Sequence, residues 1–286
     1  MNYLVRKTVL SDIGQCARIN QDSVLCRTAR CDRFGRICFA LVCDGLGGLS
    51  HGEVASSSLS GRMEKWFTGE FTRLISGAGK ARLDAGQCLH RTRLMWQSIV
   101  MEMNDLLAEQ GREQGIRMGT TVVAFLLLGQ QYLVMHVGDS RLYMTRCGML
   151  ELLTHDHSLV QMKQDAGILT PHQALHSEYG SVLLQCVGAS HVVRPDFKSG
   201  TLFENTSVLL CSDGFWRRLR VEEILSGILP DHHTDESTMS EAVRALVETI
   251  KQRGEPDNIS AVFLNLTAEN SIPAIAPVSV RQALVC

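Results

Sequence analysis

The chain of 286 residues lacks any apolar run long enough to cross a membrane. Its longest strictly apolar stretch, 122–128, has the length of a buried strand, whereas a membrane-spanning helix needs about 20 residues. No block of basic residues occurs, and the formal net charge is -2, so nothing marks a surface for nucleic acid or for an acidic membrane. These absences favour a globular protein that binds neither.

The sequence also lacks the C-x-x-C pairs of zinc ribbons and thiol oxidoreductases, although it contains 10 cysteines. Cys38, Cys43 and Cys211 lie within apolar, strand-like runs, where a free thiol behaves as a small hydrophobic side chain. The first residues, 1–7, include no apolar segment of the length that a secretory signal needs. We therefore expect a cytoplasmic protein with reduced thiols.

Strand-like and helix-like segments alternate without the regular β-α order of a doubly wound sheet. Short runs of apolar and β-branched residues predict strands at 3–9, 23–27, 36–43, 120–128, 131–138, 141–146, 207–211 and 260–266. Apolar residues at helical spacing predict helices at 55–67, 87–110, 158–166, 221–229 and 239–253. The polar stretch 68–85 is interpreted as a loop, and 267–286 as a flexible tail.

Two observations favour antiparallel sheets with helices packed outside them. The turns at 129–130 and 139–140 contain only two residues, and parallel neighbours would need a crossover of a dozen or more. The helix predicted at 87–110 carries an apolar face that packs on a core, made of Trp96, Ile99, Met103 and Leu106.

Four aspartates each lie at one end of such an apolar run: Asp44, Asp139, Asp213 and Asp257. If their carboxylates meet in a partly desolvated site, each pair repels by about 4 kcal/mol at an intermediate dielectric. Divalent cations offset such repulsion, and hard ions such as Mg²⁺ or Mn²⁺ suit an all-aspartate site better than zinc or copper. The alternative for any single aspartate is local turn chemistry, since Asp-Gly and Asp-Asn are common turn pairs.

Short motifs in a fixed order carry a resemblance to a known family. They are Asn20-Gln21-Asp22-Ser23, Asp44-Gly45-Leu46-Gly47-Gly48 with Gly52-Glu53-Val54-Ala55-Ser56, Met118-Gly119-Thr120-Thr121, Gly138-Asp139-Ser140-Arg141, Ser212-Asp213-Gly214 and Asp257-Asn258-Ile259-Ser260. Each is weak alone, but the ordered set is specific. The chain resembles a bacterial member of the metal-dependent serine/threonine protein phosphatases of type 2C, over about 11–266.

The resemblance implies an α+β fold, in which two antiparallel sheets form a sandwich flanked by pairs of helices. Strand ends would present aspartates to two central ions, Mn²⁺ or Mg²⁺. Carried over by position, Asp44 would bridge both ions and the backbone carbonyl of Gly45 would bind one of them. Asp213 and Asp257 would hold the other. Residues 1–266 would form one phosphatase domain.

Two further aspartates complete the implied metal set. Asp22 would act mainly through bound waters, and Asp139 would share a third, weaker ion with Asp213. The ions would activate a water that attacks phosphorus and would neutralise charge on the phosphoryl oxygens. Phosphoserine and phosphothreonine in proteins are the implied substrates, placed there by a serine/threonine kinase.

Two positions depart from the family pattern. The family usually has a phosphate-binding arginine three residues after the glycine that corresponds to Gly14, but Ala17 occupies that position and the arginine is Arg18. A one-residue slip in a strand reverses a side chain, although a bulge can restore it, so Arg18 is predicted to bind the phosphate with a surface role as the alternative. Leu46 stands where some eukaryotic members have a histidine proposed as the general acid.

The segment 154–205 corresponds to the variable flap of the family, and such loops tend to set partner choice. His155 and His157 begin it and are interpreted as flap residues rather than as a metal-binding pair. The compact form is similar to phosphatases that reverse kinase signalling on bacterial secretion machines, and we expect a monomer. Two alternatives stay open: a catalytically weak phosphoprotein-binding module on the same fold, and a hydrolase of small phosphoesters.

Overall fold

Two five-stranded antiparallel sheets form the centre of the computed structural model, which describes residues 3–46, 51–76, 83–175, 177–202 and 205–269. The first sheet has the order β1 (Tyr3–Asp12), β10 (Ile259–Ala268), β9 (Thr206–Cys211), β6 (Arg141–Arg146) and β7 (Met149–Leu152). The second has the order β2 (Ser23–Cys31), β3 (Gly35–Cys43), β4 (Val122–Leu128), β5 (Gln131–Val137) and β8 (Asp196–Thr201). Each pair of neighbours is antiparallel.

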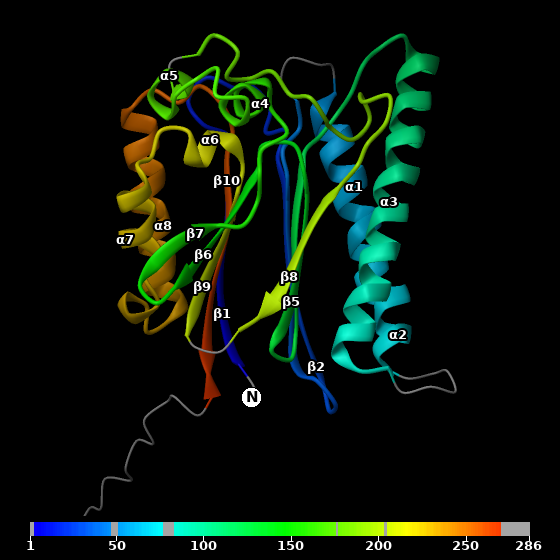
Figure 1. Ribbon diagram of the computed structural model, residues 1–286, viewed down its shortest axis with the longest axis vertical. Coiled ribbons are helices and arrows are strands. Elements are labelled where there is room, and N and C mark those ends of the chain that lie inside the picture. The colour runs from blue at the N-terminus through cyan, green and yellow to red at the C-terminus, as the bar shows by residue number, and fades with distance from the viewer. Residues whose placement is uncertain (1–2, 47–50, 77–82, 176, 203–204, 270–286) are drawn as a thin grey trace, which may run out of the picture.

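Helices cover both outer faces of the sandwich (Figure 1). On the second sheet lie α1 (Gly52–Trp66), the π-helical turn η1 (Phe67–Phe71), α2 (Thr72–Ser76) and α3 (Ala85–Gln114). On the first sheet lie α7 (Val221–Ile228) and α8 (Glu236–Gln252), joined by the 3₁₀ turn η2 (Pro230–His232). Shorter helices lie at one end of the sandwich: α4 (Leu159–Asp165), α5 (Pro171–Leu175) and α6 (Asp213–Trp216). The predicted α+β sandwich is therefore confirmed.

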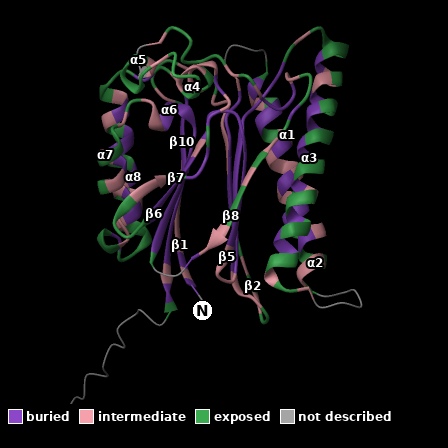
Figure 2. Ribbon diagram, in the orientation of Figure 1, coloured by how far each residue is buried: buried purple, intermediate pink, exposed green. Residues whose placement is uncertain are grey.

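The alternation of side chains along the central strands explains the four layers. Every residue of β4 is buried, as expected for a strand covered on both faces. Val123, Phe125 and Leu127 point into the core between the sheets, whereas the alternate residues pack under α1 and α3. In β10, Val262 and Leu264 likewise face the inner core, and Phe263 faces α7 and α8. Figure 2 shows the buried strands between two half-exposed helical layers.

The stretch 68–85 was predicted as a loop, and that prediction is wrong for its first half. The chain continues from α1 through η1 into α2, and ends the described helical part at Ser76. Phe67 and Phe71 are buried and stacked with ring centroids 5.5 Å apart, which anchors this turn to the core. The hydroxyl of Thr72 donates to the carbonyl of Phe67, 2.9 Å away, within the wider turn. Residues 77–82 lie outside the described ranges.

Helix α3 is longer than predicted because its ends are set by capping residues. Asp84 accepts from the backbone N–H of Gln87 at 2.8 Å, and the Gln87 side chain accepts from the Asp84 N–H at 3.0 Å. Gly115, with φ of 67°, ends the helix. The buried stripe runs through Trp96, Ile99 and Met103 to Leu107, so the assignment of Leu106 to that face is wrong.

The edge strands β7 and β8 were not predicted. Strand β8 has the sequence Asp-Phe-Lys-Ser-Gly-Thr, which has little of the apolar alternation of a half-buried strand, and its pairing with β5 places it in the sheet. At the C-terminus, Thr267 and Ala268 belong to β10 rather than to a tail. The remainder of the predicted tail, 270–286, lies outside the described residues. Within the described ranges, no helix combines the length and apolar character needed to span a bilayer.

Replacing Phe39 by alanine should destabilise the second sheet and its helices. The Phe39 ring is fully buried, with its centroid 5.6 Å from Trp66, 5.3 Å from Phe67 and 5.9 Å from Trp96. We expect Phe39→Ala to lower the free energy of unfolding by about 3–5 kcal/mol, measured by urea denaturation. Leu94→Ala, at an exposed position of α3, should change it by less than about 0.5 kcal/mol. Equal effects of the two substitutions would contradict this account of the core.

Candidate metal centre and active site

The strand register brings all the predicted aspartates to one end of the sandwich. Ser23 pairs with Cys43, so Asp22 and Asp44 leave their strands side by side. Cys211 pairs with Ala261 on one side and with Arg141 on the other. The turn that holds Asp139, the start of α6 at Asp213 and the approach to β10 at Asp257 therefore meet at this same end.

A pocket at this end is lined by the four aspartates that follow or precede strands, Asp44, Asp139, Asp213 and Asp257. Asp44, Asp139 and Asp213 are each less than a tenth exposed. Burial raises the pKa of Asp44 well above its ordinary value, and repulsion from the other carboxylates, Asp22 included, raises it further. Burial, with repulsion from Asp213 and Asp257, raises the pKa of Asp22 to about 7. The five carboxylates thus share one electrostatic environment.

The carboxylates have unused ligand capacity. Oδ2 of Asp22 and Oδ1 of Asp213 are buried and have no hydrogen-bond partner among the described residues. A buried, unpaired carboxylate oxygen is costly unless a cation or donor meets it. Oxygen ligands of this kind are those that Mg²⁺ and Mn²⁺ prefer, so the residues present fit hard divalent ions.

Backbone hydrogen bonds from the Gly119-Thr120-Thr121 segment fix the position of Asp44. The Thr121 N–H and the Thr120 hydroxyl both donate to the Asp44 carbonyl, at 2.8 and 2.9 Å. The Asp44 N–H in turn donates to the Thr121 hydroxyl oxygen at 3.1 Å. That oxygen also lies 2.7 Å from the hydroxyl of Ser140, which follows Asp139. Because these bonds use the backbone, the Asp44 carboxylate remains available.

Asn258 and Gly45 hold the loop that carries Asp22. The Asn258 side chain accepts from the Gln21 N–H at 2.8 Å and donates to the Ile13 carbonyl at 2.9 Å. A Cβ on Gly45 would lie 2.5 Å from the carbonyl oxygen of Gln21, so only glycine fits beside Asp44. The segments around Asp22, Asp44 and Asp257 are therefore packed directly against one another.

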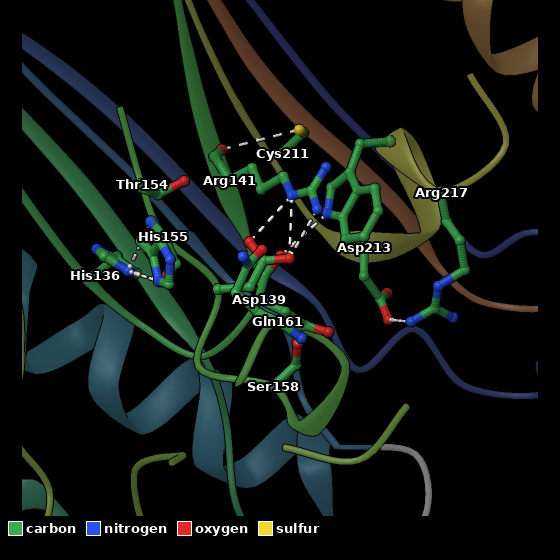
Figure 3. Close-up of polar contacts among 12 residues, drawn as sticks. His136, Asp139, Arg141, Thr154, His155, Ser158, Gln161, Cys211, Asp213 and Arg217 are labelled. Atoms are coloured by element: carbon green, nitrogen blue, oxygen red, sulfur yellow. Dashed lines mark hydrogen bonds and ion pairs between the residues drawn. The ribbon is translucent and has the colours of Figure 1, made fainter. Parts of the chain in front are cut away.

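Two arginines supply positive charge at the centre, and both are already engaged (Figure 3). Arg217, four residues after Asp213 in sequence, forms an ion pair with the Asp213 carboxylate. Arg141 donates to Asp156 of the flap at 2.8 Å and lies over the Trp216 ring, 3.3 Å from its centroid. Trp216 donates to the carbonyl of Asp139 at 3.0 Å, so Arg141 and Trp216 together hold the turn that carries Asp139.

Arg18 is not among the residues that line this pocket. Strand β1 ends at Asp12, and Arg18 lies exposed in the connection to β2. The argument from strand register does not apply there, because the residues from Gly14 to Asn20 are not in a strand. Among the described residues, no hydrogen bond or ion pair joins Arg18 to another side chain. Leu46, at the other departure from the family pattern, does line the pocket.

The two histidines that begin the flap have different partners. His155 lies 3.2 Å from Asp165, at the surface. His157 stacks on His136 with ring centroids 4.7 Å apart, and its Nε2 lies 3.3 Å from Asp196. His136, His157 and Asp196 offer ligand atoms that all lie within 4.8 Å of one another. This trio differs in charge from the aspartates, whose carboxylates repel one another in the absence of cations. Hydrogen bonds account for this trio without an ion.

Further hydrogen bonds tie the start of the flap to β5 and to Gly138, which follows that strand. His136 Nε2 lies 2.7 Å from the His155 carbonyl, and the Gly138 N–H donates to His157 Nδ1 at 3.3 Å. The His157 N–H donates back to the Gly138 carbonyl at 2.8 Å. This supports the interpretation of His155 and His157 as flap residues rather than as a metal-binding pair.

Sequence reasoning missed the contributions of Arg217, Thr120 and Thr121. The threonines belong to a motif that was noted for its resemblance, but a motif does not reveal which backbone atoms its hydroxyls reach. A signal for Arg217 was present: at i+4 on a helix, an arginine lies within reach of Asp213. The short apolar run before Asp213 did not indicate that a helix begins there.

Comparisons with known proteins agree with this geometry. A family model described as protein phosphatase 2C matches residues 17–262. Protein phosphatase PhpP of Streptococcus pneumoniae is 27% identical over 266 residues, which cover 92% of this chain and 98% of PhpP. The catalytic domain of the serine threonine protein phosphatase PstP, solved with 2 manganese ions, has a TM-score of 0.72 and 27% identity, covering 93% of this chain and 100% of that domain.

A second solved structure is PppA, described as a key regulatory component of the T6SS in Pseudomonas aeruginosa. It has a TM-score of 0.71 and 25% identity, and the match covers 92% of this chain and 97% of PppA. Both solved structures therefore share the whole sandwich rather than one sheet of it.

Metal-free protein should lose stability as the pH rises from about 4 to about 7. The pKa of Asp22 is about 7 in the folded protein and about 3.9 in an unfolded chain, so the folded state binds more protons across this window. Stability that is present at low pH is then lost as Asp22 ionises. Thermal melts in EDTA should show this decline.

Asp22→Asn should flatten the decline, and Mn²⁺ should remove it by binding the ionised carboxylates. Asp231→Asn, at an exposed acid remote from the pocket, serves as the matched control and should keep the wild-type slope. Stability that rises with pH over the same window would contradict the proposed crowding of carboxylates.

Proposed function

This chain belongs to the protein phosphatase 2C family, and we propose that it hydrolyses phosphoserine and phosphothreonine in proteins with the help of divalent cations. One observation carries the proposal: Asp44, Asp139, Asp213 and Asp257 line a single pocket although they are far apart in the sequence. A pocket floor made of carboxylates would repel a phosphate ester unless cations lay between them. We therefore interpret these four aspartates as ligands of cations.

Asp44, Gly45, Asp213 and Asp257 are the proposed ligands of the two central ions. Asp44 is the proposed ligand to both ions, and the Gly45 carbonyl is the proposed backbone ligand to one of them. Asp213 and Asp257 would hold the other ion. The unpartnered Oδ1 of Asp213 supports this role, because its Oδ2 already faces Arg217.

Asp22 and Asp139 complete the proposed set. The unpartnered Oδ2 of Asp22 suits a water-mediated contact, and Asp139 would share a third ion with Asp213. When bound, the ions supply an activated water and neutralise charge on the phosphoryl oxygens. The manganese ions in PstP favour Mn²⁺, and Mg²⁺ is the alternative. Arg18 remains a proposed phosphate contact on the strength of the family resemblance.

The chain's own residues would position and shield the reaction. The Thr120 and Thr121 hydrogen bonds hold the Asp44 backbone, so its carboxylate need not reorganise when substrate arrives. Leu46 cannot donate a proton, so the group that protonates the leaving oxygen must lie elsewhere. Residues 1–266 would act as one catalytic unit, and as a monomer.

A phosphoprotein and its serine/threonine kinase are the proposed partners. The likeness to PppA supports a place in the regulation of a bacterial secretion system. We further propose a cytoplasmic location, which agrees with the reduced thiols of Cys38, Cys43 and Cys211.

Asp44→Ala and Asp213→Ala should each reduce phosphate release from a phosphothreonine peptide by more than about 100-fold, since even residues that only support metal ligands are worth 10–100-fold. Release should require Mn²⁺ or Mg²⁺ and stop in EDTA. Asp231→Ala, an exposed acid, is the control and should keep wild-type turnover.

Nucleotides assayed in parallel separate the alternatives. Peptide binding without turnover by the wild type would indicate a phosphoprotein-binding module. Faster turnover of nucleotides than of the peptide would indicate a small-molecule phosphoesterase. Either result would overturn the proposed function.

A further inference from the structure

The pocket above the aspartates is larger than a phosphoryl group requires. Its volume is 770 Å³, within the range of about 300–1,000 Å³ that holds a whole small ligand. The carboxylates form one side, and residues 181–192 of the flap form the facing wall. A substrate whose phosphoryl group reaches the aspartates must therefore also bring its neighbouring atoms against this wall.

The flap wall carries apolar side chains that are open to solvent. Leu184 is 47% exposed and Val192 is 57% exposed, and Leu183 beside them also lines the pocket. Large apolar side chains grouped beside a charged site are typical of recognition surfaces. They can pack against an apolar side chain of a substrate, but they cannot donate a hydrogen bond to a phosphate.

The same pocket contains a cation without an acidic partner in the described part of the chain. Arg117 lines the pocket and is exposed. Other arginines around the site are paired, since Arg141 contacts Asp156, Arg217 contacts Asp213 and Arg218 contacts Glu255. No ion pair joins Arg117 to any acid in the described part of the chain, so its charge is available to an incoming anion.

The segment that carries Arg117 lies close to both Leu46 and the flap. It is followed two residues later by Gly119, where a Cβ would lie 3.0 Å from Leu46 and 3.3 Å from Ala189 of the flap. Gly119 thus lies between the residue after Gly45 and the flap wall. Arg117 lines the same pocket and lies two residues before this junction in the sequence.

We propose that this wall is a peptide subsite, in which Arg117 binds an acidic side chain and Leu184 and Val192 bind an apolar side chain close to the phosphorylated residue. This inference rests on the proposed function and names the class of phosphoprotein segment that the site selects. Charge complementarity identifies the occupant: the aspartate floor and its ions receive the phosphoryl group, which leaves the arginine and the apolar wall to flanking residues.

Phosphothreonine peptides that differ in one flanking type test the subsite. One pair places Glu or Lys within three residues of the phosphothreonine on both sides, and a second pair places Leu or Ser there. For wild-type protein, kcat/KM should favour Glu over Lys by about fivefold, as expected for an exposed ion pair. It should favour Leu over Ser by about tenfold, as expected for an apolar contact.

Arg117→Glu should invert the first preference, and Leu184→Ser should remove the second while the first is kept. Arg112→Glu and Leu94→Ser are matched controls on the exposed surface of α3 and should keep both wild-type ratios. Ratios within one enzyme cancel any general effect of a variant on folding or metal loading.

A wild type without either preference, or an Arg117→Glu variant that still favours Glu, would overturn the subsite. Peptide affinities from fluorescence anisotropy give the same ratios without turnover. Absence of hydrolysis of all four peptides and of p-nitrophenyl phosphate would therefore contradict the proposed function, whereas equal affinities would contradict the subsite.

Discussion

Repulsion among the carboxylates at one end of the sandwich is the constraint on which the site depends. Strand register forces Asp22, Asp44 and Asp213 into one partly desolvated space, where burial and mutual charge raise the pKa of Asp22 and Asp44. The fold does not relieve this repulsion with donors to every oxygen. It fixes the backbone instead, through Thr121 and Asn258, and leaves carboxylate oxygens free for cations.

The arginines near the site differ in whether an acidic side chain already pairs with them. Arg217 neutralises one oxygen of Asp213, and Arg141 joins the flap to the turn that carries Asp139 through Asp156 and Trp216. These contacts hold the structure around the carboxylates. Arg117 differs because its charge has no acidic partner in the described ranges, and it lies on the wall that faces the carboxylates. Catalytic and recognition charges are thus separated across the pocket.

Features of the fold and site that depend on local sequence pattern could be predicted from the sequence alone. Asp44 and Asp213 stand out because an apolar run ends at a turn, and the central strands and long helices follow from their periods. Features that depend on distant partners were missed. Strand β8 is a strand only because β5 pairs with it, and the chain around Phe71 stays helical because that ring packs in the core. Arg117 carries no sequence signal, because the flap residues that line the pocket with it, within 181–192, are 64 or more residues away.

Anomalous diffraction from crystals grown with Mn²⁺ would show whether these carboxylates hold metal ions. Manganese scatters anomalously, so its peaks locate ions without reference to activity. We expect manganese peaks between Asp44 and the pair Asp213 and Asp257. Manganese absent from these carboxylates, or found only beside His136 and Asp196, would contradict it.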